Sequence, residues 1–138
     1  MSWLRCMVVL ALAVPLVGCG NGLSRVSGKV TLDGQELTAS DDVRVTVFFN
    51  PTDGTRASAT GLVDEQGTYT VSTGAEAGIA PGVYKVTISG SQLIRSADGG
   101  APGGKRITPL RYASPDTSDL EVTVEPGSNE IDLHMTSN

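Results

Sequence analysis

From residue 25 onward, apolar and polar residues alternate with a period of two, and clusters of Gly, Asn, Asp and Pro interrupt the alternation every eight to twelve residues. A period of two places neighbouring side chains on opposite faces of an extended strand, whereas a helix needs a period of 3.6. In one such segment Val45, Val47 and Phe49 share a face. Arg44 and Thr46 share the other. The pattern predicts an all-β domain with no helix of consequence.

Seven segments follow this alternation: residues 25–32, 43–49, 56–63, 67–73, 83–89, 120–125 and 130–136. Each is too short to be stable alone, so the strands must bury their apolar faces against one another. We therefore expect a seven-stranded antiparallel Greek-key β-sandwich. Residues 90–106 are rich in Gly, Ser, Ala and Pro, and this composition predicts a mobile loop.

Composition excludes several classes of protein. The chain has 138 residues, of which 39% are hydrophobic, which is too many for a disordered protein and fits one globular domain. Its 17 glycines follow no three-residue repeat, which excludes collagen. The net charge of -5 provides no broad basic field, so we expect no nucleic-acid partner.

The amino terminus has the layout of a secretory signal: Arg5 precedes an apolar run over residues 6–17. This run is shorter than the roughly 18 to 20 residues of a spanning helix. It ends in Leu16-Val17-Gly18-Cys19, which resembles the bacterial lipoprotein processing motif. The resemblance implies a diacylglyceryl group on the Cys19 sulfur, cleavage after Gly18 and acylation of the new amino group. The alternative is an ordinary secreted protein in which Cys19 is a free thiol.

This interpretation divides the chain into three parts. Residues 1–18 are the cleaved lipoprotein signal peptide, residues 19–24 are the lipidated Cys and a short tether, and residues 25–138 are the domain. Two or three acyl chains suffice for stable membrane attachment. We therefore expect a lipid-anchored protein of the cell envelope, facing the periplasm. Gly20 and Asn21 carry no Asp retention signal, which favours outward export, and both the inner and the outer membrane stay open.

The domain resembles the carboxypeptidase regulatory-like family, whose fold is transthyretin-like (prealbumin-like). The resemblance rests on the order of three motifs, VSGKVTLDGQEL, ATGLVDEQGTYTVST and APGVYKVTISG, and on the ending LRYASPDTSDLEVTVEPGSNEIDLHM. In the enzymes that give the family its name, the domain accompanies a zinc peptidase domain. This sequence has no His-x-x-Glu motif and one His. The resemblance therefore implies a fold and an accessory role, with no catalysis and no cofactor.

His134 is the single histidine, and its alternation with Leu133 and Met135 predicts a solvent-facing side chain. Hydroxyisourate hydrolases and intradiol dioxygenases share this kind of fold, and both need more than one histidine. A transthyretin-like hydrolase is therefore only an alternative to a non-catalytic module. A third alternative is an assembly subunit that adds an edge strand to a partner's sheet.

Other candidate sites have structural explanations. The carboxylate pairs that could bind calcium lie beside turns, where Asp accepts backbone N–H bonds: Asp41-Asp42, Asp64-Glu65, and Asp116 with Asp119. Lys29 and Asn129 invite comparison with the isopeptide bonds of collagen-adhesin B-type domains, but such a bond needs a buried Lys. The alternation places Lys29 toward water.

Basic residues flank the Gly-rich segment and form the one local positive concentration in an acidic protein: Arg95, Lys105, Arg106 and Arg111, the last followed by Tyr112. They could contact an anionic glycan, a lipid headgroup or an envelope protein. A solvated, variable loop is the favoured explanation. The expected function is a binding or structural accessory module, held at the membrane through Cys19.

Overall fold

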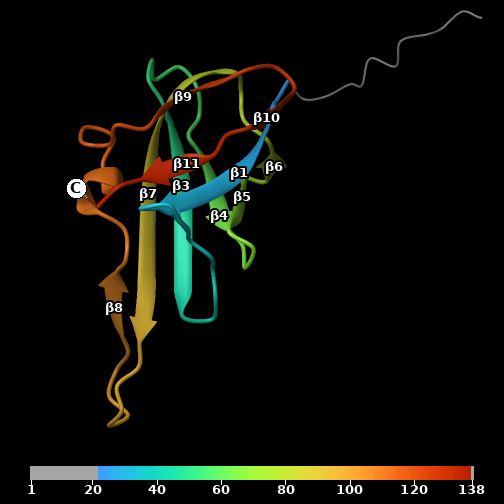
Figure 1. The fold of residues 1–138 in the computed structure, drawn as a ribbon. Coiled ribbons are helices and arrows are strands. Elements are labelled where there is room, and N and C mark those ends of the chain that lie inside the picture. Colours follow the sequence, from blue (N-terminus) through green and yellow to red (C-terminus); the bar gives the residue numbers. More distant parts are fainter. Residues whose placement is uncertain (1–21, 138) are drawn as a thin grey trace, which may run out of the picture.

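The computed structural model describes residues 22–137, and its regular structure is almost entirely β (Figure 1). The bounds of its elements are β1 Arg25–Leu32, β2 Gln35–Glu36, β3 Val43–Pro51, β4 Ala59–Val63, β5 Thr68–Thr73, β6 Glu76–Ala77, β7 Gly82–Ile94, β8 Gly103–Arg106, η1 (a 3-10 turn) Leu110–Ala113, β9 Glu121–Val124, β10 Ser128–Glu130 and β11 Leu133–Met135. The signal peptide predicted at residues 1–18 and the lipidated Cys19 lie outside the described residues. In residues 22–137 no helix has the length and hydropathy needed to span a membrane.

The strands form one curled sheet in the order β10-β1-β5-β4-β3-β7-β8. Its longest ladder joins β3 to β7, from Val43 opposite Gln92 to Pro51 opposite Tyr84. In Figure 1, β1 and β11 cross β3 and β7 at a steep angle. The protein is therefore all-β and sandwich-like. β4 and β5 continue the pairing from β3 to β1, so the two sides of the curl belong to one continuous sheet.

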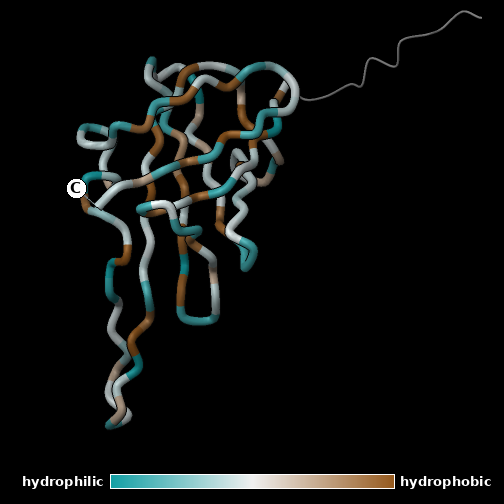
Figure 2. Tube along the Cα trace, in the orientation of Figure 1, coloured by the Kyte–Doolittle hydropathy of each residue, from teal (hydrophilic) through white to brown (hydrophobic). Residues whose placement is uncertain are grey.

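The predicted apolar faces are confirmed as the core. Its largest fully buried side chains come from strands on both sides of the curl, from η1 and, for Ile79, from the segment between β6 and β7: Phe49, Tyr69, Ile79, Tyr84, Ile88, Tyr112, Leu133 and Met135. Figure 2 shows hydrophobic and hydrophilic positions alternating along the central strands. All seven predicted strands are present, although the third begins at Ala59 and the seventh is divided into β10 and β11.

The sheet is antiparallel, as predicted, except at the carboxyl-terminal strands, which pair parallel to β1. β10 and β11 align with successive parts of β1. Between them the chain bends toward β1, and a Cβ on Gly28 would lie 2.0 Å from the carbonyl oxygen of Ile131. The Tyr69 hydroxyl donates to that same carbonyl at 2.5 Å. Gly28 on β1 leaves room for the backbone between β10 and β11, and Tyr69 on β5 holds that backbone by a hydrogen bond.

The mobile loop predicted for residues 90–106 is instead a β-hairpin. β7 continues to Ile94, and β8 pairs with its end, from Ser91 opposite Arg106 to Ile94 opposite Gly103. Figure 1 shows this hairpin projecting beyond the rest of the molecule. The Gly and Pro content that suggested a loop belongs to the turn between the strands and to the first half of β8.

Candidate functional site

The β7–β8 arm, defined here as residues 91–106, carries three of the basic residues that the sequence singled out. Arg95 is held by Asp42: its Nε and Nη2 lie 3.1 and 3.0 Å from the Asp42 Oδ1. The backbone N–H of Leu93 donates to the carbonyl oxygen of Asp42 at 2.6 Å. Asp42, a candidate calcium ligand in the sequence, thus braces the arm against the turn before β3.

Lys105 and Arg106 lie on β8, and both are exposed. Arg44 of β3 pairs with Ser91 of β7, and Ser91 pairs in turn with Arg106 of β8. Residues paired across a sheet point to the same face, so the two arginines lie on one face with Ser91 between them. Among residues 22–137, neither these arginines nor Lys105 forms an ion pair. The base of the arm is therefore a cationic surface on an acidic protein.

A hollow of about 360 Å³ lies between the arm and the turn before β3. Gly104 helps to form it, because a Cβ at this position would meet no atom within 4 Å. The side chains around it carry charges of both signs as well as an apolar group: Asp41, Asp42, Arg44, Ser91, Gln92 and Leu93. This mixture does not define one class of small ligand.

Arg111 does not join this cationic surface. Its guanidinium carbon lies 4.7 Å from the centroid of the Tyr112 ring, and its Nη2 donates to the Tyr112 hydroxyl at 2.6 Å and to the Thr136 carbonyl at 2.8 Å. The Tyr112 hydroxyl in turn accepts the Thr136 N–H at 3.0 Å. Arg111 and Tyr112 hold the end of the chain against η1.

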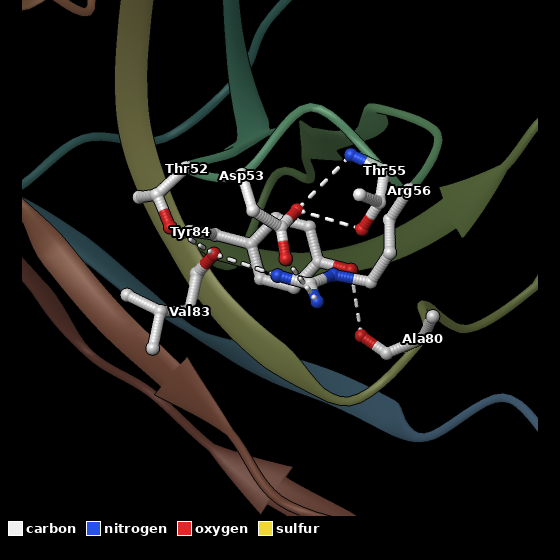
Figure 3. A network of polar contacts seen from close by, with 7 residues as sticks. All are labelled: Thr52, Asp53, Thr55, Arg56, Ala80, Val83 and Tyr84. Atoms are coloured by element: carbon white, nitrogen blue, oxygen red, sulfur yellow. Dashed lines mark hydrogen bonds and ion pairs between the residues drawn. The ribbon is translucent and has the colours of Figure 1, made fainter.

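A second arginine network, which the sequence analysis missed, lies at the turn between β3 and β4 (Figure 3). The guanidinium of Arg56 lies over the ring of Tyr84, 5.1 Å from its centroid. Its Nη1 contacts Asp53 Oδ2 at 3.1 Å, and its Nη2 donates to the Val83 carbonyl at 3.2 Å. Gly82 admits this side chain, because a Cβ there would lie 2.3 Å from the guanidinium carbon. The Pro-Gly before Tyr84 was the available signal for a close approach.

The Arg56 network is internally neutralised. Hydrogen bonds from the Thr55 backbone N–H and hydroxyl, together with the nearby Arg56 charge, lower the pKa of Asp53. The Tyr84 hydroxyl donates to the Ala80 carbonyl at 2.6 Å. These groups fasten the turn to β7, and they present no uncompensated charge to a ligand. The network is structural.

The remaining sequence candidates also have structural contacts. His134 is exposed, as predicted, and its Nδ1 lies 2.7 Å from the hydroxyl of Thr31. Lys29 is solvent-facing, as predicted, and its Nζ lies 2.9 Å from Glu36, whose hydrogen bond raises the pKa of Lys29. The side chain of Asn129 instead bonds the backbone of Glu125 and Arg25. Lys29 and Asn129 are therefore not arranged for an isopeptide bond.

Two of the carboxylate pairs form contacts that stabilise turns. Asp64 accepts the backbone N–H groups of Gln66 and Thr68, each at 2.9 Å. Asp42 contacts the arm as described above. No group of three or more metal-ligating side chains is present in the described range 22–137.

Comparison with known proteins yielded no match for this chain among family models, curated proteins or solved structures. The resemblance to carboxypeptidase regulatory-like domains thus stays a prediction. The arm is the candidate functional surface, because it combines unpaired cations, exposed backbone and apolar side chains outside the core.

Proposed function

We propose that this chain is a non-catalytic, lipid-anchored lipoprotein of the cell envelope that acts as a binding or structural accessory module. The module is a carboxypeptidase regulatory-like domain with a transthyretin-like Greek-key topology. The strand order supports this topology, since β1 lies beside β5 and β3 lies beside β7. The anchor is the lipid on Cys19, placed by its motif at the end of the apolar run.

One observation carries the proposal: the arm and the start of the described chain lie at opposite ends of the molecule (Figure 1). β1 begins at Arg25, six positions after Cys19. A spacer of this length reaches at most about 20 Å when fully extended. An anchor at Cys19 would therefore hold one end of the domain close to the membrane and direct the arm away from it.

Intact mass of the protein from a membrane fraction tests the anchor. We expect the wild type to lack residues 1–18 and to carry acyl mass, and we expect Cys19→Ala to carry none. Cys6→Ala is the matched control, because it removes a cysteine that the proposed processing discards, and its product should be identical to that of the wild type. An unacylated wild type that still contains residues 1–18 would overturn the proposal.

A second candidate function, an edge-strand assembly subunit, is favoured by a separate observation. β8 ends the sheet order, and within residues 22–137 no strand covers its outer edge. An uncovered edge offers backbone N–H and C=O groups to a strand from another chain. This function is compatible with a lipid anchor, since the edge lies on the arm.

A further inference from the structure

We propose that β8 binds an extended acidic segment of a partner protein, which adds to the sheet as its next strand. This inference deepens the assembly role proposed above by naming the chemistry of the partner. It rests on the open edge of β8, on the charges beside it and on the glycines within it.

The arm is built as an extension of the sheet and not as part of the core. β7 is mostly buried as far as Gly90, and every residue from Ser91 to Arg106 is exposed. β3 runs alongside β7 only as far as the pair Val43 and Gln92, so the arm beyond this point has two strands. A two-stranded ribbon is marginal by itself in water. A third strand from a partner would complete its pairing.

The arm is held in a defined position, which favours recognition of an added strand. Asp42 receives the Leu93 N–H at 2.6 Å through its carbonyl and the Arg95 guanidinium through its carboxylate. Both contacts fix β7 from the side opposite β8. The outer edge of β8 is therefore presented with its partner strand already ordered, which lowers the entropic cost of binding.

The charges select an acidic occupant. Lys105 and Arg106 follow each other on β8 and so point to opposite faces, and Arg44 lies in the same row as Arg106. Pairing of β8 with β8 of a second copy would bring these like charges together, which is destabilising. Carboxylates on a partner strand would meet a cation on either face. The charges of β8 therefore disfavour a second copy of this chain and are complementary to an acidic segment.

The glycines of β8 provide room for the partner's side chains. Gly103 pairs with Ile94 and Gly104 pairs with Leu93, and a Cβ on either glycine would meet no atom within 4 Å. Leu93 and Ile94 are 38% and 49% exposed. Apolar side chains of an added strand can lean over the glycines onto this pair. The matching segment thus has two adjacent acidic residues, opposite Lys105 and Arg106, and two adjacent apolar residues, opposite Gly103 and Gly104.

The test is a fluorescence-anisotropy titration of the full-length protein in detergent with a labelled peptide in which pairs of Glu residues alternate with pairs of Val residues. We expect saturable binding that weakens about tenfold or more in the double variant Lys105→Glu/Arg106→Glu, which reverses the charges on β8. The matched control is Arg25→Glu/Lys85→Glu, which changes the net charge equally on β1 and on the buried half of β7. Its affinity should stay within about twofold of the wild type.

A second peptide separates strand addition from simple charge attraction. It has the same side chains, but all of its backbone amides are N-methylated, so neither of its edges can donate hydrogen bonds to a ladder. We expect it not to bind, and we expect the unmodified peptide to slow hydrogen exchange at residues 103–106. Equal binding of both peptides, or unchanged exchange at β8, would overturn the proposal.

Two further readouts isolate the source of a failure. Sedimentation should find no self-association through β8. A dimer that is lost in the β8 double variant would overturn the proposal, because it would identify the occupant of the edge as a second copy. The Cys19→Ala variant should bind the peptide as the wild type does, because the arm is remote from the start of the domain. Loss of acylation and loss of peptide binding are therefore read independently.

Discussion

β7 contains two regions with opposite environments, and the comparison shows which part of this domain maintains the fold. Residues 82–90 alternate into the core, where Tyr84, Val86 and Ile88 are fully buried. Residues 91–94 continue the same strand with no buried side chain. Backbone pairing is therefore enough to extend a strand, but only burial supplies about 25 cal/mol for each Å² of apolar surface removed from water. The body provides stability, and the arm provides accessible surface.

Truncating one large apolar side chain in each region gives the sharpest contrast. Tyr84→Ala removes a ring that packs against Phe49 and Arg56, and we expect a loss of about 3–5 kcal/mol in the free energy of unfolding. Ile94→Ala should cost less than about 0.5 kcal/mol. Urea denaturation followed by circular dichroism measures both. A large loss for Ile94→Ala would show that the arm is packed against the body, contrary to the comparison.

A matched pair of glycines tests the same contrast through the backbone. An Ala at Gly28 would push the Ile131 carbonyl away from β1, and we expect a destabilisation of about 1–3 kcal/mol. Gly103→Ala introduces the same methyl group into open space on β8, where the change should range from neutral to a gain of about 1 kcal/mol. Thermal unfolding of the two variants side by side measures the difference. Equal effects would contradict the close approach at Gly28.

A smaller effect than those of Tyr84→Ala and of the Gly28 substitution is expected for the hydrogen bond that Tyr69 donates to the Ile131 carbonyl. Burial raises the pKa of the Tyr69 phenol, so the folded state keeps its proton to a higher pH than the unfolded state does. The resulting stability is complete below about pH 10, the ordinary value for tyrosine, and is lost as the pH rises beyond it. Tyr69→Phe should cost about 0.5–1.5 kcal/mol at neutral pH.

Urea unfolding at a series of alkaline pH values measures this effect. The wild type should lose stability faster than Tyr69→Phe above about pH 10. Parallel curves for the two proteins would mean that Tyr69 is not protected by burial.

Much of the body was predictable from sequence because its determinants are local. Alternation alone placed Val45, Val47 and Phe49 inward, and turn residues separated the strands. The parallel pairing of β11 with β1 was not predictable, since the alternation is the same for either strand direction. The parallel direction depends on the bend that brings Ile131 over Gly28. This contact joins residues that are far apart in the sequence, so no local pattern predicts it.

The candidate site was predictable in part. The concentration of Lys105 and Arg106 was visible in the sequence, but Arg111 belongs to another contact. The strand on which the pair lies was hidden by Gly103 and Gly104, whose β-propensity is low although they pair with β7. β8 nevertheless pairs with residues 91–94 of β7, so the ladder along β7 overrides the low β-propensity of the two glycines.

The pairing of β1 with β10 and β11 also has a consequence for the order in which the domain can be assembled. β1 is among the first elements synthesised, and the strands that cover one of its edges are the last. Contacts between such distant segments close slowly, because a long loop must be ordered before they form. The domain can close only after β10 and β11 have been synthesised, and until then one edge of β1 is left open.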